Sequence, residues 1–173
     1  MGRSIVNHRN NLFSNSNRYI LDRNRAIENF ANAAYKHYKA RSNRKKKRYV
    51  FNLLKQLGEM VFEAQSSKPL YEHGIGLPRA WNAPKNWAID YIKYEIGHLY
   101  SKNQGGSDKP ENLTFQSARC NQHIQTSMNY HETTEYMYVQ EVRERIDNVK
   151  KLHQTEEWKD VINKIENLLN NAS

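Results

Sequence analysis

The residues best suited to chemistry stand in one run near the middle of the chain. His98 ends a stretch rich in β-branched and aromatic residues, and a Gly-Gly-Ser-Asp turn follows at 105–108. Asn112 comes 14 residues after His98, and Asn121 comes nine residues after Asn112. A neutral imidazole, with an ordinary pKa of about 6.5, can accept a proton near neutral pH. A single histidine in a strand is more often structural, so the functional indication comes from the whole ordered set.

This ordered set resembles the ββα-metal motif of the HNH endonuclease family. The likeness extends over about 30 residues, through the turn and Asn112-Leu113 to Cys120-Asn121. It implies a metal-dependent endonuclease that hydrolyses a phosphodiester and leaves 5′-phosphate and 3′-hydroxyl ends. It also implies one divalent ion per active site, usually Mg²⁺ with Mn²⁺ able to substitute, which acts on the scissile phosphate as a Lewis acid.

The resemblance assigns the roles residue by residue. His98 matches the general base that takes a proton from the attacking water. Asn112 matches the residue that fixes the histidine-bearing strand by hydrogen bonds across the turn, and it is grouped with His98 as catalytic. Asn121 matches a metal ligand on the helix that follows.

One position departs from the family pattern. The family usually carries an acidic metal ligand just before the base histidine, whereas this chain has Gly97. Glu95 is our candidate replacement, because residues two apart share a strand face, although the offset is about 7 Å along the strand. Loss of the ligand without replacement would instead leave a nucleic-acid-binding protein that does not cleave.

Metal-binding cysteine pairs are absent from the sequence, since Cys120 is the single cysteine. We therefore expect no internal disulfide and no structural zinc, although many family members brace the motif with zinc. Aromatic residues are the expected brace, namely Trp81, Trp87, Tyr91 and Tyr94. His123 lies roughly 200° around a helix from Asn121, so we group it with Arg119 as a DNA contact rather than a ligand.

The charge is concentrated at the start of the chain. Lys and Arg number 27 against 18 Asp and Glu, and residues 1–50 hold 13 of those cations with only two acids. Arg44, Lys45, Lys46, Lys47 and Arg48 form an unbroken basic run. In a chain with a nuclease motif, such a run predicts contacts to phosphates of double-stranded DNA. A solvated run or a localisation signal is the alternative interpretation.

Apolar spacing indicates the elements that position these residues. Residues at intervals of three and four predict four helices, with their stripes at 27–38, 50–61, 139–149 and 158–169. The first helix should begin near Arg23 and end near Ser42, and Thr155 should cap the last. Residues 88–100 and 113–115 read as strands on either side of the turn, with a helix starting near Ser117.

The fold class predicted from this pattern is mainly α with a small ββα-metal (HNH) insert, an α+β arrangement. Residues 1–20 are expected to form a basic arm, and residues 21–66 a helical DNA-binding region. Residues 67–130 should contain a loop and the nuclease motif, and 131–173 the C-terminal helices.

The predicted function is a site-specific DNA endonuclease of a restriction, homing or phage type. One motif cuts one strand, so a double-strand break requires a homodimer or two successive nicks. A nonspecific or RNA-directed toxin-type nuclease is a further alternative. The sequence shows no membrane-spanning run and no secretory signal, which favours an intracellular protein, cytoplasmic or nucleoid-associated.

Overall fold

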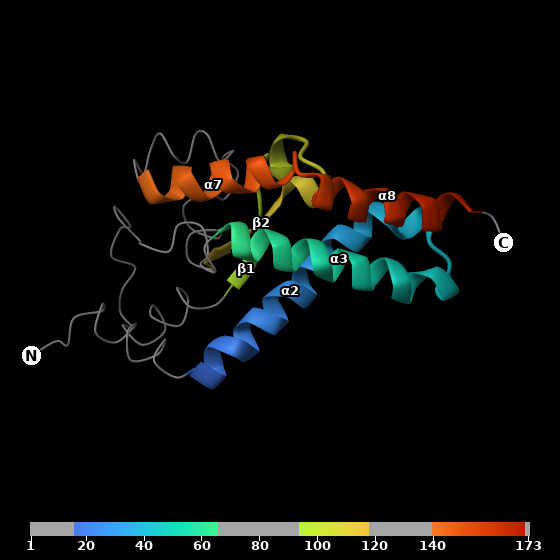
Figure 1. Ribbon diagram of the computed structural model, residues 1–173, viewed down its shortest axis with the longest axis horizontal. Coiled ribbons are helices and arrows are strands. Elements are labelled where there is room, and N and C mark those ends of the chain that lie inside the picture. The colour runs from blue at the N-terminus through green and yellow to red at the C-terminus, as the bar shows by residue number, and fades with distance from the viewer. Residues whose placement is uncertain (1–15, 66–93, 118–139, 172–173) are drawn as a thin grey trace, which may run out of the picture.

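The computed structural model describes residues 16–65, 94–117 and 140–171 of the chain. Most of these residues lie in four helices around a small antiparallel hairpin (Figure 1). The helices are α2 (Ser16–Tyr38), α3 (Arg44–Ala64), α7 (Gln140–Leu152) and α8 (Glu156–Asn170). The hairpin consists of β1 (Tyr94–His98) and β2 (Leu113–Ser117). The prediction of a mainly helical α+β chain is therefore confirmed.

The predicted apolar stripes build the core. α3 runs back across α2 and then packs against α8 (Figure 1). The buried members of the stripes include Phe30, Leu54, Leu57, Trp158 and Ile165. Burial of side chains of this size stabilises the fold by about 1.5–3 kcal/mol each before entropy is counted. The hairpin packs against α2 and α3, two of the helices that form this core.

Helix α2 begins at Ser16, earlier than the start near Arg23 predicted from its apolar stripe. Residues 16–20, which we expected in the N-terminal arm, therefore belong to the helix. No glycine or proline interrupts residues 16–22, so the helix can continue beyond the stripe. A single turn of 3-10 helix, η1 (Lys39–Arg41), then ends this segment close to the predicted Ser42.

The hairpin is attached to the helices through Phe115. Its ring lies 5.6 Å from the ring of Phe30 and 5.5 Å from that of Phe62. The Gln65 side chain, at the end of α3, also bonds the backbone of Phe115. Its Nε2 donates to the Phe115 carbonyl at 2.9 Å, and its Oε1 accepts from the Phe115 N–H at 3.0 Å. This buried amide thus pairs with the outer edge of β2 as a neighbouring strand would.

The C-terminal helices α7 and α8 both pack against α3. Thr155 caps α8 as predicted, since its hydroxyl accepts from the Trp158 N–H at 3.2 Å. Arg41 of η1 donates to both carboxylate oxygens of Glu166 in α8, at 2.6 and 3.0 Å. The bidentate pair joins the end of α2 to α8.

Some predicted elements fall outside the described residues, including the loop at 66–84, the start of the first strand at 88–93 and the helix expected after the hairpin. Ser117 itself, where that helix was expected to start, is still in β2. No helix in the described part of the chain combines the length and the apolar character needed to span a membrane.

Candidate active site

The hairpin turn brings His98 and Asn112 together. His98 ends β1 opposite Leu113, and the Leu99 N–H donates to the Asn112 carbonyl at 2.9 Å. The chain between them includes two short 3-10 turns, η2 (Lys102–Gln104) and η3 (Pro110–Asn112). The two residues separated by 14 positions in the sequence are therefore neighbours at one end of the sheet.

The Gly-Gly pair in this turn is required by geometry. Gly105 has a φ of 91°, in the left-handed region that favours glycine. A Cβ at Gly106 would lie 1.9 Å from the Tyr100 carbonyl oxygen, because the loop folds tightly onto itself. Glycine is thus favoured at 105 by the backbone angle and at 106 by the lack of space for a side chain. Together the two residues let the chain turn back toward His98.

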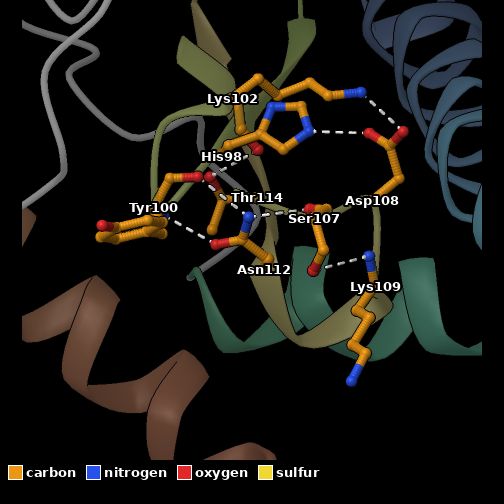
Figure 2. A network of polar contacts seen from close by, with 9 residues as sticks. His98, Tyr100, Lys102, Ser107, Asp108, Lys109, Asn112 and Thr114 are labelled. Carbon is orange, nitrogen blue, oxygen red and sulfur yellow. Dashed lines mark hydrogen bonds and ion pairs between the residues drawn. The ribbon is translucent and has the colours of Figure 1, made fainter. Parts of the chain in front are cut away.

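Asn112 holds the loop through its side-chain amide (Figure 2). Its Oδ1 accepts from the Tyr100 N–H at 2.7 Å. Its Nδ2 donates to the Tyr100 carbonyl at 3.0 Å and to the Ser107 carbonyl at 2.8 Å. These are hydrogen bonds across the turn of the kind the sequence led us to expect, and they fix the segment that directly follows His98.

His98 is hydrogen-bonded to the carboxylate of Asp108, a residue that was not selected from the sequence. Its Nε2 lies 3.0 Å from Asp108 Oδ1, and Lys102 Nζ donates to Asp108 Oδ2 at 2.7 Å (Figure 2). The side chains of His98 and Asp108 are only 18% and 16% exposed. Partial burial of this kind strengthens the electrostatic interaction while leaving solvent access.

The charge state of Asp108 follows from this environment. Burial acts to raise the pKa of the Asp108 carboxyl, but the hydrogen bonds and charges of Lys102 and His98 outweigh burial and hold that pKa below its usual value. The carboxylate is therefore ionised near pH 7 and must accept its hydrogen bond from His98. Nε2 consequently carries the proton in the neutral ring, so the bond to Asp108 sets the tautomer of His98.

Gly97 lies on the opposite strand face from His98, with Glu95 and Gln116 as its neighbours in the hairpin. Glu95 pairs with Gln116 in the register, and Gly97 pairs with Thr114. A Cβ built at Gly97 would come within 2.1 Å of Gln116 Nε2, so the fully buried Gln116 side chain fills the space in front of the glycine. Position 97 therefore has no room for a side chain unless Gln116 moves.

The remaining predicted residues are distributed over other parts of the chain. Arg119, Asn121 and His123 lie outside the described residues. The basic run Arg44–Arg48 forms the first turns of α3, and its residues are exposed except for Lys46, which is partly buried. In Figure 1 this start of α3 lies toward the C-terminal end of the molecule, away from β1. The run therefore lies apart from the cluster of His98, Asp108 and Asn112.

Three polar residues of the site were not selected from the sequence, namely Lys102 and Asp108 of the loop and Gln116 of β2. Asp108 and Lys102 flank the Gly-Gly pair, and Asp108 is the acid of the turn used to recognise the motif. That carboxylate, ten residues after a strand-ending histidine, was a usable signal. Gln116 gave none, since its position over Gly97 depends on the hairpin register.

Comparisons of the chain with protein-family models, with curated proteins and with solved structures found no match.

Proposed function

We propose that this protein is a metal-dependent HNH-type endonuclease with His98 as its general base. One observation carries the proposal: an ionised, largely buried carboxylate orients the histidine, in a loop fixed by Asn112 at the end of a two-stranded sheet. A structural histidine does not require this combination, whereas a general base requires a defined tautomer and orientation.

The proposed chemistry uses the nitrogen that does not face Asp108. Water adds to the phosphorus of the scissile phosphodiester, and its proton passes to His98 Nδ1. The bond from phosphorus to the 3′ oxygen breaks, and the departing oxygen takes a proton from solvent water, which leaves a 5′-phosphate and a 3′-hydroxyl. Asp108 stabilises the imidazolium that forms, and Lys102 keeps Asp108 ionised.

The proposal retains one divalent ion, Mg²⁺ or Mn²⁺, which would act as a Lewis acid on the scissile phosphate. Within residues 16–65, 94–117 and 140–171, no three His, Cys, Asp or Glu side chains group in a way that could hold a metal ion. Asp108 is already bonded to His98 and Lys102, so it is a poor ligand. The described residues do not fit the ion by themselves. The proposed ligands remain Asn121 and Glu95.

Double-stranded DNA is the proposed substrate. The exposed cations of Arg44–Arg48 offer phosphate contacts, and Lys109 of the active-site loop adds another near the end of α2. Burial is the largest cause that lowers the pKa of His37, and the positive charges of Lys109 and Arg41 lower it further. The two cations therefore lie in the same neighbourhood of the molecule, around His37. The side chains proposed to contact DNA phosphates therefore include residues outside Arg44–Arg48.

The direct test is incubation of a large unmodified DNA with the protein and Mg²⁺ or Mn²⁺, followed by sequencing of all product ends. A site-specific endonuclease gives 5′-phosphate ends at repeated positions, and EDTA abolishes them. Scattered ends on DNA or RNA would favour the nonspecific or toxin-type alternative. Absence of any product with either metal would contradict the proposal that this protein is an endonuclease.

A second candidate function is a nucleic-acid-binding protein that does not cleave. The specific observation in its favour is Gln116, which occupies the space of the ligand position at 97. This candidate predicts salt-sensitive DNA binding with unchanged substrate in both metals. The incubation above separates it from the enzyme.

A further inference from the structure

Helices α3 and α8 leave an open groove of about 440 Å³ between their exposed faces, within the usual size range of ligand sites. It is lined by Tyr49, Asn52 and Leu53 of α3 and by Lys164, Asn167, Leu168 and Asn171 at the end of α8. On each helix these positions are spaced by three and four residues. They therefore form two continuous helix faces that meet across the groove.

The lining combines one exposed ring with side-chain amides. Tyr49 is 64% exposed, although it belongs to a helix whose other large apolar residues are buried or partly buried. Leu53 and Leu168 supply a partly buried apolar surface beside it. Asn52, Asn167 and Asn171 are exposed and carry both donors and acceptors. A flat ligand with hydrogen-bonding edges would match this surface.

The groove also adjoins the basic run. Tyr49 directly follows Arg48, and Lys45 precedes Tyr49 by one helical turn on the same face. Lys46 Nζ donates to the carbonyl of Asn171, which is itself a lining residue. The first turn of α3 contains no acid to neutralise these cations. An anionic group beside the flat ligand would therefore be attracted to the same end of the groove.

We propose that this groove binds an unstacked nucleobase of a nucleic acid whose phosphates contact Arg44–Arg48. The Tyr49 ring supplies a stacking face, the asparagine amides meet the base edges, and the basic run holds the backbone on either side. The inference shares with the proposed function only that the partner is a nucleic acid, because an unstacked base is offered by a single strand and not by an intact duplex. It requires neither a metal nor cleavage.

The test uses the full chain carrying His98→Ala, in EDTA, so that binding is measured without cleavage. Two probes of equal charge are compared at the same salt concentration by fluorescence anisotropy. One is a single strand of twelve thymidines, and the other is a strand of twelve abasic tetrahydrofuran units. The ratio of their dissociation constants isolates the contribution of the bases, because the phosphates are the same.

The thymidine strand should bind roughly 5- to 150-fold more tightly than the abasic strand, the factor expected for stacking of one base. Tyr49→Ala should bring the ratio close to one without changing affinity for the abasic strand, whereas Tyr49→Phe should preserve the ratio. Asn167→Ala should reduce it roughly two- to tenfold, because hydrogen bonds to the base edge are removed. The matched change Asn170→Ala, on α8 outside the groove, should leave it unchanged.

A ratio that is the same in Tyr49→Ala and its parent would overturn the inference. So would a loss of self-association in Tyr49→Ala, measured by sedimentation, with the ratio unchanged, since the groove would then be a contact between copies of the chain. Failure of the natural protein to cleave DNA, together with loss of the ratio in Tyr49→Ala, would overturn the nuclease proposal alone.

Discussion

Gln116 lies across the space that a side chain at position 97 would occupy. Gln116 Cδ would be 2.2 Å, and its Cγ 2.6 Å, from a Cβ built at Gly97. The two residues are not directly opposed in the hairpin, since Gly97 pairs with Thr114. The side chain of Gln116 therefore extends along the sheet to cover Gly97, and the two positions are complementary in size.

This relationship predicts coupled effects on stability. Gly97→Asp alone should lower the free energy of unfolding by about 1–3 kcal/mol, because it overpacks a buried site. Combining it with Gln116→Ser should cost less than the sum of the two single changes, since the shorter side chain makes room. Urea denaturation of the four proteins measures this coupling. Additive costs would show that the two side chains do not compete for space.

A second prediction concerns the loop clamp. Asn112→Ala removes three side-chain hydrogen bonds and should lower the free energy of unfolding by about 1–3 kcal/mol. Asn103→Ala, at an exposed position of the same loop, is the matched control and should stay within about 0.5 kcal/mol of the natural protein. Equal thermal unfolding of the two variants would show that the clamp contributes nothing to stability.

The sequence predicted the helices far better than the side-chain contacts of the site. Stripes such as Phe30 to Tyr38 identified the core, because helical periodicity is local and a buried face repeats it. The turn was equally predictable, since Gly105 and Gly106 meet steric demands of the loop itself. The pairing of Gln65 with Phe115, 50 residues apart, depends on how distant segments pack, and no local pattern encodes it. The pairing of Asp108 with His98 lies within one turn, so its two residues could be found in the sequence, but their contact depends on how that turn folds.

A third prediction follows from His153, a partly buried histidine that directly follows α7. Burial lowers the pKa of the His153 imidazole to about 4, and its ring lies 4.6 Å from that of Trp158. In the unfolded chain the pKa returns to about 6.5. Protons therefore bind the unfolded state more tightly, and stability is lost as the pH falls from about 6.5 to 4.

His153→Phe keeps a ring against Trp158 and removes this titration. The difference in unfolding free energy between variant and natural protein should grow by about 1–2 kcal/mol from pH 7 to pH 4.5. The full shift would give about 3 kcal/mol, but solvent at the partly exposed ring reduces it. Urea denaturation at several pH values tests this, and parallel pH profiles would contradict it.

A fourth prediction separates the roles within the basic run. Changing Arg44, Lys45, Lys47 and Arg48 to Gln should weaken DNA binding on every sequence. The slope of log K against log salt should become shallower by about 0.9 for each phosphate that the variant no longer neutralises. Lys46→Gln should mainly cost stability, because its ammonium bonds the end of α8. Anisotropy titrations over a range of salt provide the slope, and an unchanged slope would identify the run as solvated.

The most direct test of the central claim is the rate of plasmid cleavage by the natural protein and by His98→Ala, in Mg²⁺ and in Mn²⁺. DNA affinity is measured in parallel in EDTA. General-base catalysis predicts a fall of at least about 100-fold in the cleavage rate with less than about tenfold change in affinity. Cleavage by His98→Ala at the natural rate, or no cleavage by the natural protein in either metal, would contradict the account.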